Sequence, residues 1–208
     1  MLFTVLLSMI PRAEAYGAWC ADHNWMDVVY NPIKTVRHDS VLAPAERYGA
    51  RLAFDGDLST AWCEGEAGHG EGKGITVVID QPRTLVAVEI HGGYFKSPAL
   101  LTANSRVRQM TMTASHGTSG QMFTSTLTLA DPAAVPAKDP CDPSGETPMD
   151  ATRWYTLTRD NPGARAYSNL ESGQSMPVDV IELDLSAVFP GSKYTDTCIS
   201  EIKLIMRD

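Results

Sequence analysis

The 208-residue chain has no cluster of lysines or arginines, and its formal net charge is −8 at pH 7. Proteins that bind nucleic acid usually present a basic patch that neutralises phosphates, so no nucleic-acid partner is expected. A membrane-spanning helix needs roughly 20 apolar residues, and the apolar run Leu2 to Ile10 is much shorter. We therefore expect no membrane span.

The chain also lacks the usual catalytic motifs. It contains no Gly-x-Ser-x-Gly segment, phosphate-binding loop or dinucleotide fingerprint. The close acidic pairs, Asp55 with Asp57 and Glu64 with Glu66, are only two residues apart. That spacing does not by itself set the roughly 5 to 9 Å that separates glycosidase carboxylates. We predict no enzymatic activity, and a small glycoside hydrolase that uses Glu64 is the weaker alternative.

The first 15 residues indicate export. The apolar run Leu2 to Ile10 is followed by Ala13-Glu-Ala15, which fits a cleavage site of small residues. We interpret residues 1–15 as a signal peptide and expect a secreted or periplasmic protein that begins near Tyr16. No basic residue precedes Leu2, so a buried strand is the alternative.

The cysteines suit an oxidising compartment. Their number is even, and no Cys-x-x-Cys motif occurs, which disfavours zinc sites and thioredoxin-type chemistry. Four cysteines allow three pairings, and free thiols are a further alternative. We favour pairing Cys20 with Cys63 and Cys141 with Cys198, since the first two flank the earliest strands.

Short segments rich in β-branched and aromatic residues predict an all-β fold. Gly, Pro, Asn and Asp separate them, and no segment has a sustained helical stripe, so we predict an antiparallel β-sandwich. The proline-rich stretch 131–150 is predicted to be a surface excursion. Residues 16–34 are interpreted as an N-terminal extension and residues 35–208 as the sandwich. Segments 33–38 and 39–42 together suggest a first short strand, and the further predicted strands are 75–80, 85–91, 107–115, 121–129, 153–158, 178–185 and 198–206.

The segment Arg51 to Trp62 is the most distinctive stretch. Asp55 and Asp57 flank Gly56, and Thr60 follows, so several oxygen atoms can turn toward one point. Calcium takes six to eight oxygen ligands, which makes this a candidate cation loop. A plain Asp-Gly-Asp turn without metal is the alternative.

Ala53 to Trp62 resembles the signature of discoidin-like, galactose-binding-like β-sandwiches, a group that includes many bacterial carbohydrate-binding modules. From about residue 35 onward, the chain resembles one branch, the NADase-type glycan-binding domains. The name refers to an accessory domain, so the resemblance implies no NAD-cleaving activity. The further matching blocks are Trp62-Cys-Glu-Gly65, His91-Gly-Gly-Tyr-Phe-Lys-Ser97, Asn104-Ser-Arg-Val107 and Phe189 to Ile202.

This resemblance implies a jelly-roll, galactose-binding-domain-like fold with a structural calcium ion. In that family the metal ties an early loop to the last strand, so its binding energy becomes folding energy. Carried over position by position, the implied calcium ligands are Leu52, Asp55, Asp57, Thr60, Ser200 and Glu201.

A second group of residues is a candidate glycan site. Glu64 and His69 lie in a Gly-rich loop that can adapt around a polar ligand, and a solvated loop without ligand is the alternative. Tyr94, Lys96, Asn104 and Arg106 bracket the next loop and offer a flat ring and hydrogen-bond donors. Asn104 and Arg106 are equally suited to satisfying loop carbonyls.

Trp62 is predicted to fill the core rather than to stack on a sugar. The sequence thus predicts an exported, non-catalytic, calcium-stabilised sandwich that binds a glycan or another cell-surface ligand. A structural or protein-interaction module of the cell envelope is the alternative.

Overall fold

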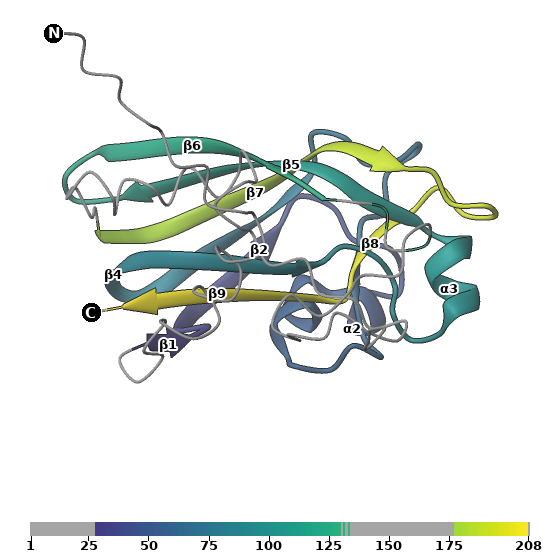
Figure 1. Ribbon diagram of the computed structural model, residues 1–208, viewed down its shortest axis with the longest axis horizontal. Coiled ribbons are helices and arrows are strands. Elements are labelled where there is room, and N and C mark those ends of the chain that lie inside the picture. The colour runs from purple at the N-terminus through teal and green to yellow at the C-terminus, as the bar shows by residue number, and fades with distance from the viewer. Residues whose placement is uncertain (1–27, 130, 132, 134–176, 208) are drawn as a thin grey trace, which may run out of the picture.

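The computed structural model describes residues 28–129, 131, 133 and 177–207. Within these residues the chain forms a nine-stranded curled sheet with three short helices at one end (Figure 1). The elements are β1 (Val28–Tyr30), β2 (Ile33–His38), α2 (Ala45–Tyr48), η2 (Ala50–Phe54), β3 (Trp62–Cys63), β4 (Gly74–His91), α3 (Pro98–Ala103), β5 (Ser105–His116), β6 (Gln121–Thr128), β7 (Pro177–Phe189), β8 (Thr197–Ile199) and β9 (Glu201–Arg207).

The sheet order is β1-β9-β4-β7-β5-β8-β3, with β2 paired to β4 and β6 paired to β5. Every pairing is antiparallel except β5 with β8, which run parallel. Figure 1 shows β5, β6 and β7 in one layer and β1, β9 and part of β4 in the other. The predicted all-β antiparallel sandwich is therefore confirmed.

Strand β4 belongs to both layers. Its first half pairs with β2 and β7, and its second half pairs with β9. The register shifts between Val78 and Arg83, in the stretch that contains Pro82. Because proline has no N–H to donate, it interrupts a ladder and favours the bend by which one strand crosses between sheets.

The core lies between the two layers, and alternate residues are buried along much of β5, β6 and β7. In β5, Met110, Met112 and Ala114 are fully buried, and Thr111 and Thr113 face outward. This alternation is broken at the start of the strand. Val107 is also buried, because irregular pairing on either side of Gln109 shifts the face on which side chains point.

Most predicted strands are present, with altered ends. Segments 75–80 and 85–91 are one continuous strand, and 198–206 is split by Ser200. The first predicted strand ends at His38, and its predicted part 39–42 is wrong: the polar groups of that segment bind Trp62, Gly65 and Cys63 instead of a ladder. Segment 153–158 lies outside the described residues. Part of the predicted N-terminal extension is edge strand β1, which pairs with β9.

Candidate functional site

The loop that follows η2 is built around a tight Asp-Gly-Asp turn. Gly56 has a φ of 77°, a conformation that glycine adopts without steric cost. Asp55 Oδ1 accepts the Asp57 N–H at 2.9 Å, and Asp57 Oδ1 accepts the Ser59 N–H at 2.8 Å. These short-range bonds hold the turn locally.

The Thr60 hydroxyl lies where the oxygens of this loop converge. It is 2.8 Å from Asp55 Oδ2, 2.9 Å from Asp57 O and 3.4 Å from Leu52 O. A hydroxyl has only one proton to donate, so it cannot satisfy all three acceptors at once. The loop therefore holds more acceptor oxygens than protons, which is the composition that a hard cation requires.

Glu201, at the start of β9, reaches the same loop. The residue is 2% exposed, and Oε2 accepts the Gly56 N–H at 2.9 Å. Burial raises the pKa of Glu201 to about 7; the bond from Gly56 opposes this rise and the charge of Asp55 adds to it. A cation bound between Asp55 and Glu201 would stabilise both ionised carboxylates.

Ser200 binds the loop through its side chain. Its hydroxyl donates to Leu58 O at 3.2 Å and accepts the Phe95 N–H at 3.0 Å. The structure thus brings the cation-loop residues next to the start of β9, as a shared ion would require. Among the described residues no group of three or more His, Cys, Asp or Glu side chains is arranged to hold a metal. Carboxylates and neutral oxygens fit calcium better than zinc, and the ligand roles of the six residues stay a prediction.

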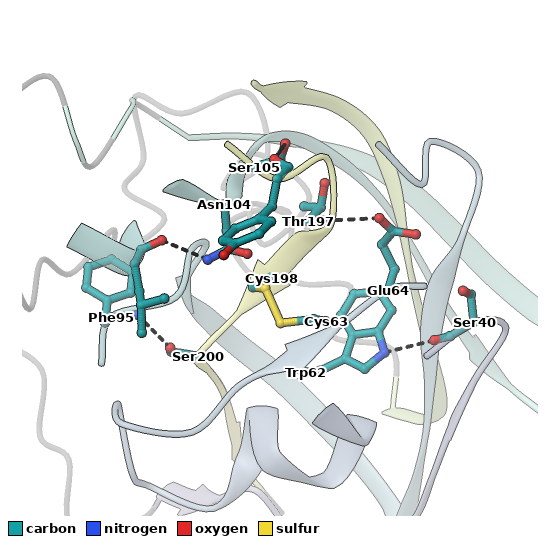
Figure 2. The surroundings of a disulfide bond; sticks show 12 residues. Ser40, Trp62, Cys63, Glu64, Phe95, Asn104, Ser105, Thr197, Cys198 and Ser200 are labelled. Carbon is teal, nitrogen blue, oxygen red and sulfur yellow. Dashed lines mark hydrogen bonds between the residues drawn. A yellow bond between two sulfur atoms is a disulfide. The ribbon is translucent and has the colours of Figure 1, made fainter. Parts of the chain in front are cut away.

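A disulfide joins Cys63 on β3 to Cys198 on β8 (Figure 2). The two residues lie directly opposite each other in the antiparallel register and are 1% and 0% exposed. The pairing predicted from sequence is therefore wrong, because β8 lies between β5 and β3 and so brings Cys198 to Cys63. Cys20 and Cys141 lie outside the described residues.

Trp62 precedes the disulfide and is fully buried, as predicted. Its indole N–H donates to Ser40 O at 3.0 Å, which joins the segment after β2 to β3. The side chain therefore belongs to the hydrophobic core and cannot stack on a ligand.

Glu64 occupies the interior rather than a ligand-facing surface. It is 0% exposed, Oε1 accepts the Thr197 N–H at 3.1 Å, and Oε2 accepts the Glu66 N–H at 2.8 Å. Burial raises the pKa of Glu64, and the two backbone donors oppose the rise. A Cβ on Gly70 would lie only 2.4 Å from the Glu64 carboxyl carbon, so the Gly-rich loop closes over this side chain.

His69 lies at the surface of the same loop, half-buried. Its Nδ1 is 3.0 Å from Ser105 Oγ and 3.1 Å from Thr195 O, so the tautomer with a proton on Nδ1 donates to that carbonyl. The Thr197 hydroxyl donates to His69 O at 2.7 Å. These bonds fix the ring, and Nε2 has no hydrogen-bond partner among the described residues.

Tyr94 packs beside the disulfide. Its half-buried ring lies against the cluster of Ala61, Cys63 and Cys198, together with Tyr48 and Leu42. Lys96, two residues later, is exposed.

Glycine is required before Tyr94 for steric reasons. A Cβ on Gly92 would lie 2.9 Å from Val107 Cβ, and one on Gly93 would lie 2.5 Å from Leu101 Cδ1. The Gly-Gly pair thus lets the loop press against α3 and β5, which positions the tyrosine.

Asn104 and Arg106 have structural partners. Asn104 Nδ2 donates to Leu100 O at 2.9 Å and caps α3. Arg106 is 6% exposed and binds both oxygens of Asp131, at 2.7 and 3.1 Å. Its guanidinium also donates to the carbonyls of Leu101, Thr102, Asn104 and Pro190. Of the two roles considered from sequence, the contacts favour satisfying loop carbonyls for both residues.

Two surface tyrosines were missed as ligand candidates. Tyr194 is 40% exposed, and the Lys193 ammonium lies 4.9 Å from its ring centroid. Tyr48 lies in α2 next to Tyr94, and no sequence signal connects residues 46 positions apart. Among the described residues, no helix has the length and apolar character needed to cross a membrane.

The fold and these loops define a discoidin-like, or F5/8 type C, β-sandwich. The model of the NAD glycohydrolase translocation F5/8 type C domain matches residues 29–205, and the chain belongs to this family. The resemblance noted from the sequence is thereby confirmed. No curated protein is similar enough to count as a relative.

Several solved structures share the fold. An F5/8 type C domain from Bacteroides fragilis is 16% identical, with a TM-score of 0.52, and the match covers 88% of this chain and 97% of that one. The family 32 carbohydrate-binding module of NanJ from C. perfringens, solved with galactose, is 14% identical with a TM-score of 0.54, covering 86% and 98%. Two modules of Clostridium perfringens ZmpB, solved with GalNAc, are 12% identical with a TM-score of 0.55, covering 90% and 36%. At these identities the likeness concerns the fold.

Proposed function

We propose that this protein is an exported, non-catalytic carbohydrate-binding module stabilised by a calcium ion. The observation that carries the proposal is the shared fold: family 32 modules of the same architecture were solved with galactose and with GalNAc. The family match over most of the chain supports the same class of protein.

The glycan would bind at the end of the sandwich that surrounds the disulfide. His69 and Tyr94 contact neighbouring residues of β8, since His69 O accepts from Thr197 and Tyr94 packs on Cys198. A half-buried tyrosine supplies an apolar face, and the outer nitrogen of His69 supplies a hydrogen-bonding group. Sugar recognition needs this combination of a flat ring and oriented polar groups.

A calcium ion would hold the loop at Asp55 against Glu201. Its ligands would come from the carboxylates of Asp55 and Glu201 and from neutral oxygens such as Leu52 O. The ion would supply charge neutralisation and rigidity and take no part in chemistry.

Export is supported by the buried disulfide, because such bonds persist in oxidising compartments. Expression of the full chain in its host followed by cell fractionation tests this directly. The module should be recovered outside the cytoplasm, and a cytoplasmic product with reduced Cys63 and Cys198 would contradict export.

The absence of catalysis is supported by the position of Glu64. Its two oxygens accept backbone N–H groups and the side chain is fully buried, so it cannot reach a glycosidic bond.

The envelope-module alternative is favoured by one observation. Three of the six predicted ligand contacts, Glu64, Asn104 and Arg106, are engaged inside the fold. An interaction module would give a blank glycan array and would retain one defined envelope protein in a pull-down.

A glycan array probed with the full chain tests the proposed function. We expect reproducible binding that Tyr94→Ala and His69→Ala weaken, and Tyr30→Ala is the matched control because Tyr30 is 52% exposed on β1. An array without hits, or hits that all three variants weaken equally, would refute the proposal.

A further inference from the structure

We infer that Tyr48, Tyr94 and the Arg47 guanidinium form one sugar-binding platform over the disulfide and that it selects a sugar bearing a carboxylate. This inference rests on the proposed function, because it specifies the ligand class of a glycan-binding module. Tyr48 and Arg47 come from α2, whereas Tyr94 comes from the loop after β4.

The rings of Tyr48 and Tyr94 pack on the same buried cluster. Both tyrosines pack on the cluster of Ala61, Cys63 and Cys198, whose residues are 0%, 1% and 0% exposed. Each ring is itself half-buried, so part of its surface is open to solvent. A ring held on one side and open on the other is what a sugar needs in order to stack.

The platform is rigid before any ligand arrives. The Gly93 N–H donates to His91 O at 3.0 Å, and the Phe95 N–H donates to Ser200 Oγ at 3.0 Å, so Tyr94 lies between two fixed residues. In α2, which carries Tyr48, the Arg47 N–H donates to Pro44 O at 3.0 Å. Preorganisation of this kind reduces the entropy lost on binding, which favours a shallow site.

The phenol hydroxyls are available to a ligand. Neither Tyr48 nor Tyr94 forms a side-chain hydrogen bond to another described residue. Burial raises the pKa of Tyr94, nearby Tyr48 adds to the rise, and Arg47 opposes it, which places the three groups within electrostatic range of one another. Hydroxyls of a sugar would supply the partners that the two phenols lack.

Arg47 gives this platform a guanidinium that is free to bind an anion. It is exposed and makes no ion pair with a described carboxylate, although Glu46 precedes it on α2. Lys96, two residues after Tyr94, is a second exposed cation and acts electrostatically on Asp57. The chain as a whole has a net charge of −8, so an unpaired guanidinium is a distinctive point of attraction for an anionic ligand. A guanidinium binds a carboxylate through paired hydrogen bonds, which points to a uronic or other acidic sugar.

A matched pair of ligands separates charge from shape. Trigalacturonate and its fully methyl-esterified form have the same rings and differ in the carboxylate charge. Isothermal titration of the full chain at fixed ionic strength should show that the acid binds about tenfold more tightly than the ester. Arg47→Gln should remove this preference, and Tyr94→Ala and Tyr48→Ala should weaken both ligands at least several-fold.

The controls use equivalent residues elsewhere. Arg37→Gln on β2 and Tyr30→Ala on β1 change exposed side chains of the same type and should leave both affinities unchanged. Circular dichroism spectra and thermal midpoints of all variants verify that each one is folded, and Tyr48→Phe and Tyr94→Phe replace any alanine variant that is not.

The outcomes separate this inference from the proposed function. Equal binding of acid and ester, or loss of the preference in Arg37→Gln, would overturn the inference and leave glycan binding intact. Binding of polyglutamate as tight as that of trigalacturonate would also overturn it, since the surface would then recognise acidic protein. If neither these sugars nor any array glycan binds, both proposals fail.

Discussion

The backbone N–H of Gly56 donates a 2.9 Å hydrogen bond to Glu201, across 145 positions of the sequence. This contact joins the turn after η2 to the first residue of the last strand. It also places a buried carboxylate, whose pKa burial raises to about 7, within electrostatic range of Asp55. Two carboxylates brought together in this way are costly unless a cation or a proton neutralises them.

Calcium should therefore stabilise the fold. At a calcium concentration about 100 times the dissociation constant, we expect the thermal midpoint to rise by roughly 5 to 10 °C relative to EDTA. Asp55→Asn should remove this response, whereas Glu182→Gln, an exposed acid on β7, should retain it. Differential scanning calorimetry with and without EDTA measures the effect, and an Asp55→Asn variant that responds like the wild type would refute the site.

The disulfide should contribute strongly to stability. It closes a loop of 135 residues, for which chain entropy gives about 4 to 5 kcal/mol. Replacing both Cys63 and Cys198 with alanine should lower the free energy of unfolding by about that amount in a urea titration. Peptide mapping without reductant should recover a Cys63–Cys198 peptide, and recovery of Cys63 linked to Cys20 would contradict the structure.

Arg106 should matter for folding and not for ligand specificity. Lysine cannot reproduce its bidentate contact with Asp131 together with its bonds to surrounding carbonyls, so Arg106→Lys should cost about 2 to 4 kcal/mol of unfolding free energy. The matched change Arg37→Lys at an exposed position should cost almost nothing. A folded Arg106→Lys variant of normal stability that has lost glycan binding would show that Arg106 contacts the ligand.

The stability that Asp184 contributes should fall as the pH rises. A carboxylate paired with a cation has the opposite dependence. Burial, with the charges of Asp39 and Glu182, raises the pKa of Asp184 above 3.8. Its stabilising contribution is complete below pH 3.8 and is lost as the pH rises through the higher pKa of the folded state. Asp184→Asn should therefore raise the thermal midpoint by roughly 1 to 3 °C at pH 7 and have little effect at pH 3.5.

Asp80 should show the opposite pH dependence to Asp184. The hydrogen bond from Arg83 lowers the pKa of Asp80, so its ionised form stabilises the fold above pH 3.8. Asp80→Asn should lower the midpoint at pH 7. If both asparagine variants shift the midpoint in the same direction, the electrostatic assignment of Asp184 is wrong.

The fold was largely predictable because its signal is local. The inward residues of β5 and β7 recur with period two, and the segments between strands carry turn-forming residues. The exceptions are also local in cause: the irregular pairing at Gln109 brings Val107 and Met110 to the same face, which no periodicity predicts.

The site was less predictable because it depends on long-range neighbours. Cys198 meets Cys63 because β8 pairs with β3, and sequence spacing carries no information about that pairing. The sequence predicts that Glu64 is an acid of a Gly-rich loop, but in the structure the loop encloses it. The backbone N–H groups that bind its carboxylate occur in any sequence and therefore give no sequence signal. The candidate cation loop was proposed from sequence because Asp55, Asp57 and Thr60 fall within one short motif, whereas the approach of Tyr48 to Tyr94 exists only in three dimensions.

The central claim is that the chain binds a glycan and leaves it intact. Nuclear magnetic resonance of a galactose-terminated or galacturonate oligosaccharide mixed with the full chain in calcium follows binding and hydrolysis in one sample. We predict saturable broadening of the sugar signals, weakened by Tyr94→Ala, with no new reducing-end signals over days. Signals that stay sharp across a panel of array sugars, or the growth of a cleaved product that depends on the protein, would contradict the account.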